Sequence, residues 1–220
     1  MPYADGKILQ DSEYAAHLLA QKVMCYKNSN TIVVGVGPSG SSVGQSLAKE
    51  LNLPFEVVLC RDIKHPANER KIIGSVSDGA VVMCDDTDDI PQNFLMRHII
   101  NLKHEIEHDY KTIYGNRPKP SFRNMTVIPV ADVLINPDGL LAGIEAIKSH
   151  IPLKVIVAVP VVARHAAAKV AGQVNDFVFL RMEPGNLDEK NYVGRNSYID
   201  LMKIKNSVIS YKARSTFDQY

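Results

Sequence analysis

Short runs of apolar, mainly β-branched residues alternate along this chain with longer amphipathic stretches. A continuous run of this kind occurs at Thr31–Gly37 and is typical of a parallel strand covered on both faces, and Leu153–Pro160 predicts another buried strand. Phe55–Arg61, Thr126–Val130 and Phe177–Leu180 predict three further strands. Because strands alternate with helical patterns, the sequence predicts an α/β fold with a mainly parallel sheet flanked by helices.

The amphipathic stretches predict five helices, and two short apolar segments predict one hairpin. The helices are expected over residues 12–27, from about 43 to 51, over 94–114, from near 139 onwards, and over 164–174. Ile72–Val76 and Ala80–Cys84 flank Ser77-Asp78-Gly79, so they are predicted to pair as a hairpin across this turn.

Composition limits the class of protein. With 220 residues, 45% hydrophobic, the chain is long enough for one α/β domain over residues 1–220, with a core at about 8–202 and a C-terminal tail at 203–220. A formal charge of +1 indicates neither nucleic acid nor a membrane surface as a partner, and no apolar run has the length of a membrane span. There is no signal-peptide pattern, and the three widely spaced cysteines favour reduced thiols, so we expect a cytoplasmic protein.

The stretch from Thr126 to Lys148 is the central unit of the prediction. It contains a strand, an acidic residue (Asp132) just past the strand end, and a helix starting near Gly139. In open α/β sheets, phosphate-bearing ligands bind at such a position because free amides and the helix dipole favour negative charge. We therefore expect this loop to be the position of an anionic ligand.

Several segments carry a resemblance to a known family. They are IVVGVGPSGSSVGQSLAKEL, VVLCRDIKHPANERKIIGSV, VIVAVPVVARHAAAKV, VNDFVFLRMEP and the closing YVGRNSYID. With them the chain resembles the type I phosphoribosyltransferases, most closely the generic prokaryotic proteins with this domain, over about residues 8–202. The resemblance implies transfer of phosphoribosyl from phosphoribosyl pyrophosphate to a base, with Mg²⁺ bound to the diphosphate, in a homodimer.

The resemblance also implies roles for the residues of the central loop. In the family, two adjacent acids follow the central strand and hold the ribose hydroxyls, and a G-x-x-T-G loop then holds the 5-phosphate. Only the second acid is present here, as Asp132, which is implied to hold the ribose and assist the cationic transition state. The positions implied to contact the phosphate are Asn136, Asp138, Gly139 and Leu140.

The resemblance further implies a cleft at the strand ends, formed by the loops at residues 37–42, 61–68 and 131–139. Ser39, Gly40 and Ser41 occupy the family's pyrophosphate loop, where Pro38 replaces an arginine, and Arg61 matches a basic position of the next strand. In the closing segment, the residues implied to frame the base side of the cleft are Tyr192, Arg195 and Tyr198.

The chemistry of the central loop argues against efficient transfer. Pro137 has no amide proton to offer a phosphate, and Asn136 before it is biased toward extended geometry. Asp138 is expected to cap the helix itself, and its carboxylate would repel a phosphate by about 3 kcal/mol per charge pair at ~5 Å and an effective dielectric of about 20. We therefore expect transferase activity to be weak or absent. The alternative is a non-catalytic protein of the same fold that binds a nucleotide, a phosphosugar or a partner, with Asn136–Gly139 acting as a turn.

His104-Glu105-Ile106-Glu107-His108 matches H-E-x-x-H, the helical motif of zinc proteases. No third ligand has an obvious source downstream, and mixed charges surround the motif. A solvated helix face is the simpler interpretation, and a zinc hydrolase is the remote alternative. No metal site is assigned.

Overall fold

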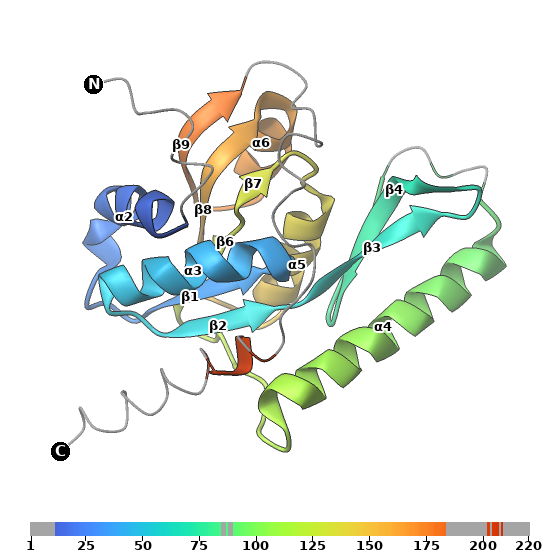
Figure 1. Ribbon diagram of the computed structural model, residues 1–220, viewed down its shortest axis with the longest axis horizontal. Coiled ribbons are helices and arrows are strands. Elements are labelled where there is room, and N and C mark those ends of the chain that lie inside the picture. The colour runs from blue at the N-terminus through green and yellow to red at the C-terminus, as the bar shows by residue number, and fades with distance from the viewer. Residues whose placement is uncertain are drawn as a thin grey trace.

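A six-stranded parallel sheet forms the centre of the protein (Figure 1). The computed structural model describes residues 12–84, 87, 90–183, 202, 204–206 and 208, except for the side chains of Pro38 and Ser39. The strand order is β2-β1-β6-β8, and β7 and β9 both pair with β8. The strands are β1 (Thr31–Val36), β2 (Phe55–Val58), β6 (Thr126–Val130), β7 (Val133–Leu134), β8 (Lys154–Ala163) and β9 (Asp176–Glu183). Every pair in this sheet is parallel, so the predicted α/β class is confirmed.

Helices cover both faces of the sheet, which explains the continuous apolar runs in the sequence. Alternate residues of one strand enter different cores: Val33 of β1 packs with the α2–α3 side, and Val34 with the α5–α6 side. The helices on the two sides are α2 (Ser12–Lys22), α3 (Gly37–Leu51), α5 (Asp138–Lys148) and α6 (Arg164–Ala171), and a short 3₁₀-helix η1 (Met24–Tyr26) follows α2. Every residue of β1 and β6 is buried.

A second, antiparallel sheet and one long helix project to one side of the parallel sheet (Figure 1). The sheet has the order β3-β4-β5, formed by β3 (Cys60–His65), β4 (Asn68–Ser77) and β5 (Val81–Met83). The predicted hairpin is confirmed, because β4 and β5 pair from Gly74 opposite Met83 to Val76 opposite Val81. The predicted strand 55–61 is divided at Leu59, where the chain leaves the parallel sheet and enters the antiparallel one.

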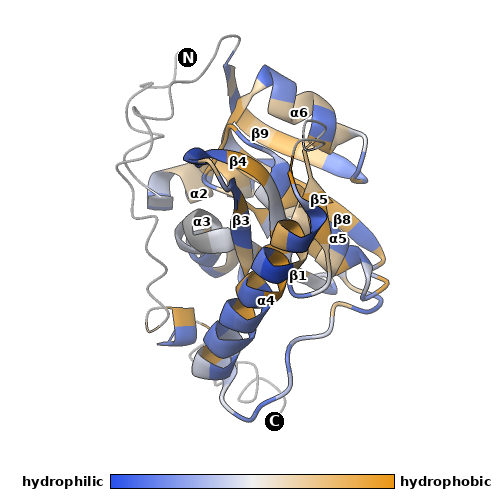
Figure 2. Ribbon diagram, turned by 90° about the vertical axis from the view of Figure 1, so that its right-hand side faces the viewer, coloured by the Kyte–Doolittle hydropathy of each residue, from blue (hydrophilic) through white to orange (hydrophobic). Residues whose placement is uncertain are grey.

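The long helix α4 (Gln92–Tyr114) is anchored at this junction by two tyrosines. The Leu59 amide donates to the Tyr110 hydroxyl at 3.0 Å, and the Tyr114 hydroxyl donates to the buried Glu56 carboxylate at 2.6 Å. Burial raises the pKa of both phenols, so both stay protonated. The rest of α4 presents mainly hydrophilic residues (Figure 2).

The start of α3 differs from the prediction. The helix begins at Gly37, directly after β1, rather than near residue 43. The small residues that were expected to form a loop instead form its first turns, with Pro38 in the first turn, where its missing N–H costs no helical hydrogen bond. Gly40 allows this close approach, because a Cβ there would overlap the Val130 carbonyl oxygen at the end of β6.

Among the described residues, no helix is both long and apolar enough to cross a bilayer.

Candidate functional site

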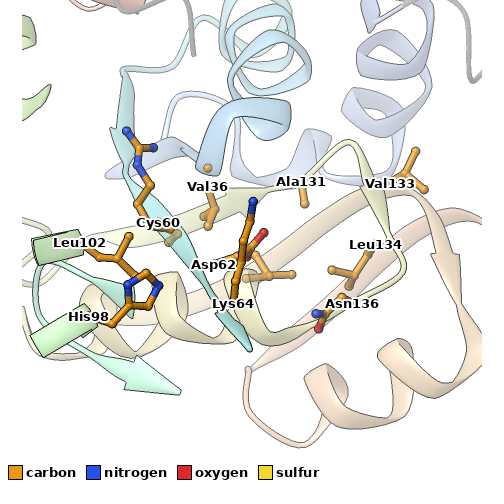
Figure 3. Close-up of a pocket in the computed structure, with 14 residues that line it drawn as sticks. Val36, Cys60, Asp62, Lys64, His98, Leu102, Ala131, Val133, Leu134 and Asn136 are labelled. Atoms are coloured by element: carbon orange, nitrogen blue, oxygen red, sulfur yellow. The ribbon is translucent and has the colours of Figure 1, made fainter. Parts of the chain in front are cut away.

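A cavity of about 590 Å³ lies at the carboxyl ends of β1 and β6, where β3, α4 and the start of α5 approach them (Figure 3). Figure 3 shows His98 and Leu102 of α4 at one end of the cavity and Asn136 at the other, with Lys64 between them. The lining residues are Val36, Gly37, Cys60, Arg61, Asp62, Lys64, His98, Leu102, Ala131, Val133, Leu134, Asn136, Gly139 and Leu140. Cavities of this size hold small organic ligands.

The first turn of α5 contributes two residues to the lining of this cavity. The Asp138 amide donates to Asn136 Oδ1 at 3.0 Å, and Leu141 begins the helical hydrogen bonds by donating to the Pro137 carbonyl. The amides of Gly139 and Leu140, both lining residues, belong to the first turn and have no helical acceptor. Three of the predicted phosphate contacts, Asn136, Gly139 and Leu140, therefore lie together.

Asp138 does not have the predicted capping role. Asn136 accepts the Asp138 amide instead, and the Asp138 carboxylate accepts a hydrogen bond from the Cys84 thiol at 3.0 Å. Asp138 is buried and is not a lining residue. The reason is local: Asn136 precedes a proline and has the short side chain that reaches the amide two residues on.

The described part of the segment predicted to bind pyrophosphate is mostly turned away from the cavity. Among the residues of 37–42 whose side chains the structure describes, only Gly37 lines it, because Gly40 packs on the end of β6 and the buried Ser41 hydroxyl donates to the Gly37 carbonyl at 3.1 Å. The side chain of Ser39 lies outside the described residues.

Arg61 lines the cavity, but its guanidinium is engaged by α4. It forms an ion pair with the buried Asp109 and lies 3.7 Å from the exposed Glu105 carboxylate. Lys64, also on β3, is exposed, and no carboxylate among the described residues forms an ion pair with it. Of the two lining cations, Lys64 therefore has the charge that a ligand can use.

Asp132 lies between β6 and β7 and is 8% exposed. Its neighbours Ala131 and Val133 line the cavity, whereas Asp132 itself is not a lining residue. Part of the predicted loop after Asp132 is instead the short strand β7, whose Val133 pairs with Val161 of β8. The implied role of Asp132 at a ribose stays a prediction.

Cys60 lines the cavity as a buried thiol, and burial raises its pKa to about 12. Such a thiol is protonated at neutral pH and is a poor nucleophile. It acts as part of an apolar wall that also includes Val36, Leu102 and Leu134.

The H-E-x-x-H motif lies on α4 as predicted, with His104 and His108 exposed and Ile106 buried. Glu105 is the residue 3.7 Å from Arg61, and Glu107 pairs with Lys111 at 3.1 Å on the same helix. Within the described part of the chain there is no group of three or more histidine, cysteine or acidic side chains that could hold a metal ion.

Sequence reasoning missed several lining residues. Lys64 falls within the predicted cleft segment 61–68 but was given no role there, whereas His98 and Leu102 had no local signal because α4 reaches the cavity only through tertiary packing. The closing segment with Tyr192, Arg195 and Tyr198 lies outside the described residues.

Solved structures similar to this chain include phosphoribosyltransferases. TT1426 from Thermus thermophilus matches with a TM-score of 0.73 and 20% identity, over 91% of this chain and 97% of that one. APRTase from Giardia lamblia, complexed with 9-deazaadenine, has a TM-score of 0.48 and 15% identity (82% and 85% of the two chains). A purine phosphoribosyltransferase from Pyrococcus horikoshii has a TM-score of 0.46 and 16% identity (77% and 82%). No family model matches the chain. The chain therefore shares its overall fold with TT1426.

Proposed function

We propose that this protein binds a phosphorylated small molecule, a nucleotide or a phosphosugar, in the cavity between β3, α4 and α5, and that it has little or no phosphoribosyltransferase activity. The observation that carries the proposal is the meeting of two kinds of anion-binding group in one cavity. Lys64 and two residues of the first turn of α5, Gly139 and Leu140, line the same 590 Å³ space.

These groups suit a phosphate for simple electrostatic reasons. The amides at the start of a helix carry a partial positive charge, and α5 points this end at the cavity. Asp138 is the acid expected to oppose a phosphate, but it is outside the lining and accepts a hydrogen bond from the Cys84 thiol, so the acid among the lining residues is Asp62. The remaining wall, with Leu102, Leu134 and Val36, suits a base or another apolar group.

The same lining does not favour transfer from phosphoribosyl pyrophosphate. Transfer relies on groups that hold the diphosphate and stabilise the developing ribosyl cation. Arg61 is committed to Asp109, and Asp132 is not a lining residue. With no group of three or more potential ligands among the described residues, Mg²⁺ would have to be bound mainly by the diphosphate of the substrate.

Calorimetric titration with ribose 5-phosphate tests the proposal, with unphosphorylated ribose as the comparison ligand. We expect sub-millimolar binding of ribose 5-phosphate and no measurable binding of ribose. Failure of every phosphorylated ligand tried, including adenosine monophosphate, would refute the proposal. Rapid, base-dependent release of pyrophosphate from phosphoribosyl pyrophosphate in the presence of Mg²⁺ would refute the proposal that the protein has little or no transferase activity.

A bulky substitution at a lining residue tests whether the ligand binds in this cavity. A Cβ at Gly139 has only Ser75 Oγ within 4 Å, at 3.7 Å, so Gly139→Leu adds a bulky side chain to a lining residue without a backbone clash. We expect it to weaken ribose 5-phosphate binding at least about tenfold, equivalent to about 1.4 kcal/mol. Gly172→Leu is the matched control because a Cβ at Gly172 meets nothing within 4 Å. Equal affinities for the two variants would show that the ligand binds elsewhere.

A further inference from the structure

Helix α4 packs on the rest of the protein through a line of side chains spaced four residues apart. Residues at this spacing lie on one face of a helix. The members of the line that pack in or against the core on the α2–α3 side are Phe94, Leu102, Ile106, Tyr110 and Tyr114. The line also contains His98, which is half-buried and lines the cavity. An imidazole therefore stands in a hydrophobic packing face at the point where that face reaches the cavity.

The ring of His98 is held in place by its neighbours on α4. It is stacked with the Phe94 ring, with the two centroids 5.5 Å apart and the planes inclined by 20°. Phe94 is itself half-buried against the core, and Leu102, one turn beyond His98, is 8% exposed and also lines the cavity (Figure 3). A fixed planar ring beside an aliphatic side chain is a surface on which another flat ring can stack.

This stacking surface lies at the opposite end of the cavity from Asn136 (Figure 3). Asn136 comes just before the first turn of α5, whose residues Gly139 and Leu140 line the cavity as well. A ligand with its phosphate at α5 therefore extends its other end toward α4. The cavity of about 590 Å³ is large enough for a nucleotide, whereas a phosphosugar has no flat ring to place against His98.

We propose that the natural ligand is a nucleotide whose base stacks on His98 at the α4 end of the cavity, while its phosphate lies at the first turn of α5. This inference rests on the proposed function, since it requires that a phosphorylated ligand binds in this cavity. It selects a nucleotide over a phosphosugar. It also assigns base recognition to α4, a helix to which the family resemblance gives no role.

Adenosine monophosphate and ribose 5-phosphate are the matched probes because both contain a ribose phosphorylated at C5, and only the first has a base at C1. Stacking of a base on an aromatic side chain strengthens binding by about tenfold or more. We therefore expect calorimetry to show adenosine monophosphate binding at least about tenfold more tightly, a factor equivalent to about 1.4 kcal/mol. Equal or weaker binding of adenosine monophosphate would overturn the inference and leave the proposed function intact. Binding of neither probe would overturn both.

Two substitutions at His98 test the residue assignment. His98→Ala is expected to weaken adenosine monophosphate binding about tenfold and to leave ribose 5-phosphate binding within about twofold of the wild type. His98→Phe keeps a flat ring and is expected to keep the wild-type affinity for adenosine monophosphate. His104→Ala is the matched control, since His104 is an exposed residue of α4 outside the cavity lining. An unchanged affinity of His98→Ala, with circular dichroism showing a folded protein, would overturn the assignment, and so would an equal loss in folded His98→Phe.

Discussion

Arg61 is predicted to stabilise the fold and to contribute little to ligand binding. Arg61→Met keeps most of the aliphatic side chain and removes the guanidinium from Asp109 and Glu105. The consequence differs at the two acids, because the Asp109 side chain is 12% exposed and the Glu105 side chain is 60% exposed. Water can replace the arginine at Glu105 but not fully at Asp109.

The magnitude follows from this partial burial. An exposed ion pair contributes about 0–1 kcal/mol, and breaking a fully buried pair costs about 3–5 kcal/mol. With Arg61 25% and Asp109 12% exposed, the pair lies between these limits. We therefore expect Arg61→Met to lower the free energy of unfolding by about 2 kcal/mol, and the melting temperature by about 4–8 °C for a chain of this length.

Urea denaturation at pH 7 of Arg61→Met, Asp109→Leu and the double variant measures this coupling. The double variant is expected to recover about 1 kcal/mol or more relative to Arg61→Met, because it no longer contains the unpaired buried carboxylate. Lys148→Met is the control, since it breaks an exposed pair with Glu145 and should change stability by less than about 0.5 kcal/mol.

Two results would refute this reasoning. If Arg61→Met matched the wild type in stability, the Arg61–Asp109 pair would not form in solution. If the folded variant lost affinity for ribose 5-phosphate by about tenfold or more, Arg61 would be a ligand contact.

Two further predictions concern packing. Gly40→Ala should lower the free energy of unfolding by about 3 kcal/mol, because its Cβ would overlap the Val130 carbonyl oxygen, whereas Gly172→Ala should change it by less than about 0.5 kcal/mol. Equal urea midpoints for the two variants would contradict the packing of α3 on β6. Since burial raises the Cys60 pKa to about 12, a thiol reagent at pH 8 should label the exposed Cys25 in the native protein, and Cys60 only in urea. Equal labelling rates in the native state, read by mass spectrometry of the labelled peptides, would contradict the burial of Cys60.

The sequence by itself determined the fold class and most of its elements. Continuous apolar runs predicted β1, β6 and β8, and turn chemistry at residues 77–79 predicted the β4–β5 hairpin. These features are set by local periodicity and turn propensity, which can be read within a window of a few residues. For the same reason, β1 and the start of α5, which meet at the cavity, were located correctly, whereas β3 was predicted only as the end of a strand over 55–61.

Tertiary structure decided where helix α3 begins and which charges remain available. Residues 37–42 look like a loop because they are small and polar, and only packing of Gly40 on β6 makes them helical. Arg61 was predicted to bind ligand, but its partner Asp109 is distant in the sequence and becomes a neighbour only when α4 packs on β3. Local pattern determines which face of a segment is buried, whereas the partner of a charged side chain depends on contacts between segments far apart in the chain.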